Sequence, residues 1–130
     1  QEAEAVLNEL HIQNLFTEEE KNILLPQLKA MMAHPVIGTW FDKQWEVRTE
    51  VPVLIPGGRQ SRIDRVMIGK KNTVIIDYKT GEKKQQDRTQ VESYTGLLSQ
   101  MGYPNVEGYL LYLDEMEVVT VVRGSTLELF

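Results

Sequence analysis

The sequence contains no cysteine, which excludes disulfide bridges and thiolate metal sites. It also lacks any apolar run near the ~20 residues that a membrane helix needs, and its start lacks the basic and apolar segments of a signal peptide. These absences fit a protein of the reducing cytoplasm, which is the location we expect. The 130 residues, 42% of them hydrophobic, suit one compact domain with its own core.

The net charge of −5 is distributed unevenly along the chain. Residues 1–55 and 91–130 each carry −5, whereas residues 56–90 hold nine basic and four acidic side chains and so carry +5. A basic segment inside an acidic chain is typical of a local surface for a phosphate backbone. Solvated, lysine-rich hairpin loops have the same composition, and charge by itself favours that second interpretation.

Helical patterns occupy the first third of the chain. The sequence starts at Gln1, without Met, and runs directly into such a pattern, so we expect an excised piece of a larger protein. Thr17 followed by Glu20 is a capping box that predicts the start of a second helix. Pro26 predicts a kink or a break in it, and His34-Pro35 predicts its end. Residues 36–41 are expected to add one short helical turn.

From Trp45 onward the apolar period changes from helical to two, which predicts strands separated by Gly- and Pro-rich turns. One more helix has an apolar face running from Val91 to Met101, and it ends at Gly102. This order predicts a mixed α/β fold with a sheet of about five strands and helices on both faces. The predicted strands cover residues 45–55, 62–68, 73–79, 106–113 and 118–122.

Two of these strands carry an aspartate in an apolar setting, although aspartate is depleted in strands. Asp77 and Lys79 share a face because residues two apart in a strand do. If the second and third strands pair through the turn at 69–72, Asp64 lies level with Asp77. Mg²⁺ binds through one or two carboxylates, a bound metal activates water, and a lysine offsets developing negative charge. The grouping therefore predicts a metal-dependent phosphodiesterase.

A lone Asp-x-Lys is a weak signal, since an Asp–Lys pair at the end of an edge strand has the same spacing. The order of several segments is more specific. Asp64 lies on one strand, Asp77 follows thirteen residues later at the end of the next, and a helix with Gln90 and Tyr94 comes after them.

The stretch from Arg62 to Tyr94 resembles the RecB-like nucleases of the PD-(D/E)XK superfamily. The likeness is greatest to the C-terminal nuclease domain of AddA-type helicase–nucleases with UvrD-like motors, and it covers roughly residues 46–113. It implies a restriction-endonuclease-like α/β fold, a mixed central sheet flanked by helices, and one nuclease domain over residues 1–130. Three segments carry it: Arg62-Ile63-Asp64-Arg65-Val66, Val74-Ile75-Ile76-Asp77-Tyr78-Lys79-Thr80-Gly81 and Gln90-Val91-Glu92-Ser93-Tyr94.

The resemblance also implies a role for each matching residue. Asp64 and Asp77 would be metal ligands, with the carbonyl of Tyr78 as a third, and Lys79 would be the catalytic lysine. The remaining two residues would contact DNA or order the catalytic loop: Gln90 and Tyr94. From periodicity alone, the helix tyrosine fits a core position equally well.

The implied activity is that of a Mg²⁺- or Mn²⁺-dependent deoxyribonuclease, exonuclease or endonuclease, serving DNA double-strand-break repair and recombination. The implied partners are DNA, an ATP-dependent helicase motor in the same parent chain, and a second helicase–nuclease subunit. No membrane is implied. Four lysines lie outside the matching segments, in turns and loops, and we expect them to support DNA binding through phosphate contacts: Lys70, Lys71, Lys83 and Lys84.

The chain departs from the family pattern at two places. Ser61 stands where members often carry glycine, three residues before the first aspartate. Members also carry a metal-binding histidine on an N-terminal helix in a Gly-x-x-x-His setting, which neither His11 nor His34 has. We therefore expect the histidine-bearing helix to precede Gln1. Glu50 resembles an acidic position of the family, but the strand pattern favours a solvent-facing glutamate.

Two other interpretations remain beside the nuclease. A catalytically silent DNA-binding or protein-interaction module could use the same fold, because a fold does not establish an activity. The missing histidine and the acidic exterior favour that module, whereas the Asp-x-Lys sequence favours the enzyme. A generic α/β domain with an accidental match is the third interpretation. Since the metal site lacks its histidine, we expect weak or no activity from this piece of chain alone.

Overall fold

The computed structural model describes residues 17–33, 37–41, 45–55 and 57–123. The chain divides into two compact units, residues 1–43 and 44–130. The helix expected before Thr17, and the two histidines, His11 and His34, lie outside the described residues. Among the described helices, none is long and apolar enough to cross a membrane.

The first unit contains the helix α2 (Glu18–Met32) and the 3₁₀ helix η1 (Ile37–Phe41). Thr17 caps α2 as predicted: its Oγ1 accepts from the Glu20 N–H at 3.2 Å, and its own N–H donates to Glu20 Oε1 at 2.8 Å. The helix runs through Pro26 to Met32, so the proline does not break it. The short turn expected at residues 36–41 is present as η1.

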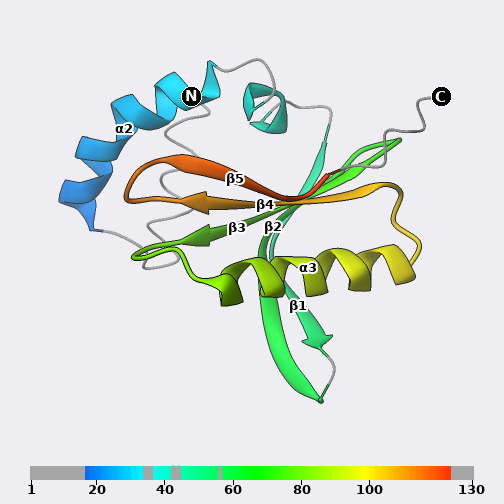
Figure 1. Cartoon of the computed structure of the whole chain (residues 1–130). Helices are drawn as coiled ribbons and strands as arrows, with labels where there is room; N and C mark the ends of the chain where they lie inside the picture. The colour runs from blue at the N-terminus through cyan, green and yellow to red at the C-terminus, as the bar shows by residue number, and fades with distance from the viewer. Residues whose placement is uncertain (1–16, 34–36, 42–44, 56, 124–130) are drawn as a thin grey trace. The chain divides into compact units, whose positions relative to one another are not determined.

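The second unit is a five-stranded sheet with one helix, in the order β1-β2-β3-β4-β5 (Figure 1). All neighbouring strands are antiparallel except β3 and β4, which are parallel and are joined by the helix α3. A parallel pair requires such a crossover connection. The predicted mixed α/β class with a restriction-endonuclease-like sheet is confirmed. The elements are β1 (Glu46–Ile55), β2 (Arg59–Ile68), β3 (Thr73–Lys79), α3 (Gln85–Gln100), β4 (Val106–Tyr112) and β5 (Glu117–Val122).

Glycine sets two of the chain reversals. Gly57 and Gly58 have φ angles of 100° and 82°, so the turn is tight and β2 pairs with β1 from Arg59 onward, earlier than predicted. Gly102, with φ of 96°, ends α3 as predicted. Its N–H donates to the Ser99 carbonyl and the Tyr103 N–H donates to the Leu98 carbonyl, both at 3.1 Å, which is a Schellman motif.

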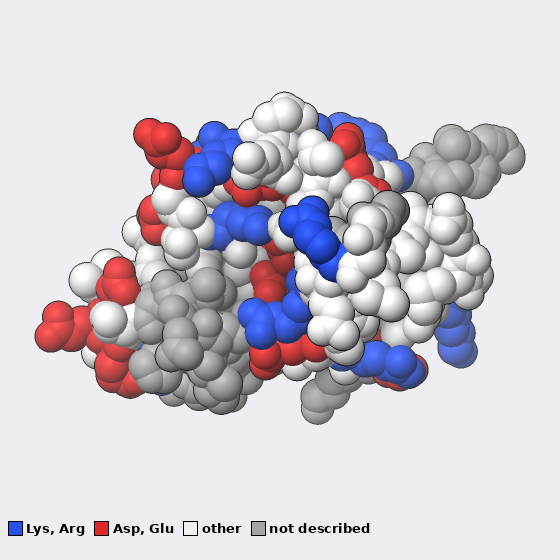
Figure 2. All heavy atoms as spheres, turned by 90° about the horizontal axis from the view of Figure 1, so that it is seen from below, with Lys and Arg blue, Asp and Glu red and all other residues white. Residues whose placement is uncertain are grey.

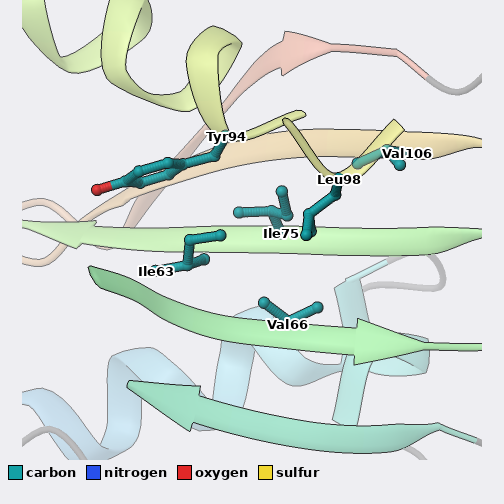
Figure 3. Close-up of a cluster of buried hydrophobic side chains, with 6 residues drawn as sticks. All are labelled: Ile63, Val66, Ile75, Tyr94, Leu98 and Val106. Atoms are coloured by element: carbon teal, nitrogen blue, oxygen red, sulfur yellow. The ribbon is translucent and has the colours of Figure 1, made fainter. Parts of the chain in front are cut away.

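The core lies between the sheet and α3. Figure 3 shows Tyr94 and Leu98 extending from α3 to the strands, with the Tyr94 hydroxyl pointing toward the end at which β3 finishes. One part of the predicted helix face is wrong, because Met101 is 62% exposed and the buried stripe ends at Leu98. The buried cluster is Ile63, Val66, Ile75, Tyr94, Leu98 and Val106.

The close approach of α3 to β4 depends on Gly108. A Cβ atom at this position would lie 2.5 Å from Val91 Cγ1 and 2.7 Å from Thr95 Cγ2, on two β-branched side chains with little rotamer freedom in a helix. We expect Gly108→Ala to lower the free energy of unfolding by about 1–3 kcal/mol, because α3 must move away from the sheet. Urea denaturation measures this change.

The matched control is Gly96→Ala, on the exposed side of the same helix, where an added Cβ would meet nothing within 4 Å. This variant should raise stability by about 0.5–1 kcal/mol through helix propensity. Equal effects at the two glycines would show that α3 is not pressed against β4 as described.

Candidate active site

The second and third strands separate at Asp64. Their last paired residues at this end are Arg65 and Ile76, and continuing the register by one pair sets Asp64 opposite Asp77. At this point the Asp64 side chain accepts the hydrogen bond from β3 that a backbone carbonyl of β2 would otherwise accept. The Tyr78 N–H donates to Asp64 Oδ2 at 2.9 Å. The hydrogen bond fixes the Asp64 carboxyl group between the two strands.

The structure brings the two aspartates together in a buried place. Asp64 is 8% and Asp77 3% exposed. Burial, followed by the charge of Asp77 and a hydrogen bond with it, raises the pKa of Asp64 to about 7, while the Tyr78 N–H and Arg62 act in the opposite direction. Two buried carboxylates in contact require a shared proton or a cation.

Lys79 completes the group on the same face of β3. Its Nζ lies 3.1 Å from Asp77 Oδ2 and donates to Gln90 Oε1 of α3 at 2.7 Å. The chain after it is also held, since the Leu113 N–H donates to the Lys79 carbonyl at 2.9 Å and the Gly81 N–H to Asp114 Oδ2 at 3.0 Å. The half-buried ammonium group is therefore directed at the aspartate pair.

Tyr94 belongs both to the core and to the surroundings of the site. Its ring is buried, and its hydroxyl donates to the Arg62 carbonyl at 3.1 Å and bonds with Ser61 Oγ at 2.5 Å. Burial raises the pKa of this hydroxyl, and the charge of Asp77 raises it further. The bonds tie α3 to the part of β2 that precedes Asp64. The sequence marks Ser61 only as a departure from glycine and gives no signal for its contact with Tyr94, a residue 33 positions away.

Glu50 is on β1 and lies opposite Asp64 of β2, because the flanking pairs of the register are Thr49–Arg65 and Val51–Ile63. Its φ of 51° is unusual for a residue other than glycine. The exposed side chain forms an ion pair with Arg62 at 2.9 Å. This placement agrees with a solvent-facing glutamate.

The aspartate pair has the chemistry of a divalent-cation site. Hard cations such as Mg²⁺ take oxygen ligands, and a cation would neutralise two carboxylates that are otherwise forced together. Within the part of the chain that the structure describes, no group of three or more His, Cys, Asp or Glu side chains gathers to hold a metal. Asp64 and Asp77 therefore fit as a two-carboxylate set, with the backbone of Tyr78 beside them.

Lysine and arginine side chains are interspersed with acidic ones over the face shown in Figure 2 and do not merge into one continuous patch. The lysines expected to bind DNA are also widely separated. Lys70 and Lys71 lie in the turn before Thr73, at the opposite end of β3 from Lys79. A seven-residue strand spans roughly 20 Å, so this turn is far from the aspartate pair.

The burial of Asp64 predicts a pH-dependent stability without metal. Its folded pKa of about 7 exceeds the ordinary value of about 3.9, so the stability that it contributes is complete below the ordinary value and is lost as pH rises through about 7. Asp64→Asn cannot ionise and should be more stable than wild type at pH 8, by on the order of 1–3 kcal/mol. At pH 5 the difference should fall to roughly a third, and it should vanish only below about pH 4, the ordinary pKa of the group. Urea denaturation with a chelator at both pH values measures it.

Glu92→Gln removes an exposed carboxylate from α3 and serves as the control, with no such pH-dependent gain expected. If Asp64→Asn is less stable than wild type at pH 8, the two carboxylates do not repel one another in the folded protein.

Comparison with known proteins identifies the family. The family model for the PD-(D/E)XK nuclease superfamily matches residues 1–124. No curated protein matches the chain. A solved structure titled "Crystal structure of SSO0001" is similar over 95% of this chain and 71% of that chain, with 16% identity and a TM-score of 0.44. The family match spans nearly the whole sequence, and the chain belongs to the PD-(D/E)XK nuclease superfamily.

Proposed function

We propose that the chain is a metal-dependent deoxyribonuclease that hydrolyses phosphodiester bonds of DNA with Mg²⁺ or Mn²⁺ held by Asp64 and Asp77. The observation that carries the proposal is the meeting of these two buried carboxylates with the ammonium group of Lys79. Proteins of this superfamily are usually nucleases that use divalent metal ions. The family match and the local chemistry thus support the same reaction.

Each residue has a defined task in this proposal. When bound, the metal supplies positive charge against the phosphate and a water of lowered pKa. Asp64 and Asp77 hold it, with the Tyr78 carbonyl as the third ligand, and the Tyr78 N–H keeps the Asp64 carboxyl in position. Lys79 donates to oxygen atoms that gain negative charge as the bond breaks. Gln90 limits the motion of that ammonium group by accepting a hydrogen bond from it.

The proposed setting is the nuclease domain of a helicase–nuclease that processes DNA double-strand breaks in the cytoplasm. The three ordered segments around Asp64, Asp77 and Gln90 support it through their likeness to AddA-type enzymes. The proposed partners are DNA, a helicase motor in the same parent chain and a second helicase–nuclease subunit. A metal-binding histidine on a further helix would complete the site. A DNA-cleavage assay of the parent protein tests this setting.

A catalytically silent DNA-binding or interaction module is the second candidate. The observation that favours it is the absence of a third acidic or histidine ligand beside the aspartate pair within the described residues. Cleavage of single-stranded DNA by the parent protein, with Mg²⁺ or Mn²⁺ and with chelator, separates the two functions. Metal-dependent cleavage that Asp77→Asn abolishes establishes the nuclease. DNA binding without cleavage in the parent protein establishes the silent module.

A substitution at Lys79 distinguishes a role in catalysis from a role in DNA binding. Its ammonium group lies beside the proposed metal ligands, so it acts mainly on charge that develops in the transition state. We expect Lys79→Ala in the active parent protein to lower kcat by a factor on the order of 10² or more, with little change in the Kd for DNA. Single-turnover cleavage at saturating DNA measures the first quantity and fluorescence anisotropy the second.

Lys70→Ala is the control, since it removes the same charge at the far end of β3 and should leave kcat unchanged. Thermal unfolding of both variants verifies that they remain folded. Normal cleavage by Lys79→Ala at saturating DNA, with weakened binding, would make Lys79 part of a basic surface instead of a catalytic residue.

A further inference from the structure

A small pocket lies beside the first turn of α3, on the flank that faces β4 and β5. Its volume is about 220 Å³, below the roughly 300–1,000 Å³ of sites that enclose drug-sized molecules. That size suits a single phosphate group better than a whole nucleotide. The pocket is lined by Lys83, Lys84, Gln85, Arg88, Tyr112 and Val119, and no acidic residue is among them.

The acidic side chains around the pocket are already engaged. Glu117 and Glu115 both pair with Lys83, the second at 3.7 Å, and the Lys83 ammonium lies 5.5 Å from the centre of the Tyr112 ring. Asp87 accepts from the Tyr112 hydroxyl at 3.0 Å and from the Lys84 N–H at 3.1 Å. One of the three cations is thus neutralised by its neighbours.

The other two cations of the pocket have no such partner. Neither Lys84 nor Arg88 forms an ion pair with any residue that the structure describes. Lys84 is exposed and Arg88 half-buried. Lys84 and Arg88 together outweigh the single charge of Asp87 beside them, which favours a monoanionic oxygen group that a guanidinium can bind through two parallel hydrogen bonds.

The pocket and the catalytic group share neighbouring strands and the same turn of α3. Tyr112 is the partner of Lys79 in the parallel pairing of β3 and β4, and neighbouring strands are about 4.8 Å apart. Arg88 precedes Gln90 by two residues, which is about 3 Å along the axis of α3. The start of the helix therefore separates the catalytic group on one flank from the basic pocket on the other.

We propose that this pocket binds a phosphate of the DNA strand near the one being cut, through Lys84 and Arg88. The inference rests on the proposed nuclease function and extends it to a second contact with the same substrate. A strand held at Asp64 and Asp77 then passes the start of α3 and places a nearby phosphate in the pocket. Binding of this kind is independent of base sequence and depends on salt.

The test compares two double variants that remove equal charge: Lys84→Gln with Arg88→Gln, and Lys70→Gln with Lys71→Gln in the distant turn. Both are made in the parent protein with Asp77→Asn, which prevents cleavage. Anisotropy with a single-stranded oligonucleotide over a series of salt concentrations gives Kd and its salt slope. The pocket variant should bind at least ten-fold more weakly, with a slope reduced by about 1.4 for two lost contacts. Because Lys70 and Lys71 lie at the far end of β3 from the aspartate pair, the structure reduces the DNA contact that the sequence led us to expect of them, and the control should change Kd less than two-fold.

Equal losses in the two double variants would overturn the proposal, because only overall charge would then matter. Arg88→Lys keeps the charge and should retain part of the affinity, which separates a binding loss from misfolding. Oligonucleotides with a 5′-phosphate, with a 5′-hydroxyl and in circular form distinguish a terminal phosphate from an internal phosphodiester. A loss on circular DNA assigns the pocket to internal phosphates, and a loss confined to 5′-phosphorylated DNA assigns it to the strand end.

The two hypotheses fail in different ways. If the parent protein with Asp77 intact never cleaves DNA, the nuclease proposal fails, although the pocket can still account for binding. If the parent protein cleaves DNA and the pocket variant binds like the control, the pocket proposal fails alone.

Discussion

Two carboxylates that share one buried place are the constraint on which the site depends. Burying Asp64 beside Asp77 is unfavourable without a compensating charge or proton, and the fold supplies partial compensation from the Tyr78 N–H and from Lys79. The remaining imbalance is what a divalent cation would remove. We expect such a site to be less stable without a cation than with a neutral residue in place of Asp64, which is a common relation between function and stability.

The packing of the helix α3 against the sheet positions the residues that surround the aspartate pair. Tyr94 and Leu98 anchor it on the strands, and the absence of a side chain at Gly108 lets it approach β4 closely. Gln90 then reaches the ammonium group of Lys79, one turn before the Tyr94 hydroxyl bonds with β2. A shift of the helix would therefore loosen the lysine and the strand that carries Asp64 together.

The basic side chains of this molecule do not form one large surface, and their position in the fold decides what each can bind. Its overall balance is acidic, and basic side chains are mixed with acidic ones over the surface in Figure 2. The basic segment that stands out in the sequence divides in the structure, with Lys70 and Lys71 at one end of β3 and Lys84 and Arg88 near the other. Lys84 and Arg88 line a concave site near the aspartate pair, whereas Lys70 and Lys71 lie in the turn at the far end of β3.

The sequence by itself determined the features that depend on neighbouring residues. Thr17 with Glu20, the glycine at 102 and the period-two runs specify their elements because capping, positive φ and strand alternation are local properties. The order of Asp64, Asp77, Lys79 and Gln90 likewise indicated the family. Only the tertiary structure decided the parallel pairing of β3 with β4, the contact of Ser61 with Tyr94, the exposure of Met101 and the pocket between α3 and Tyr112. These depend on segments far apart in the chain, whose approach is set by the packing of the whole core.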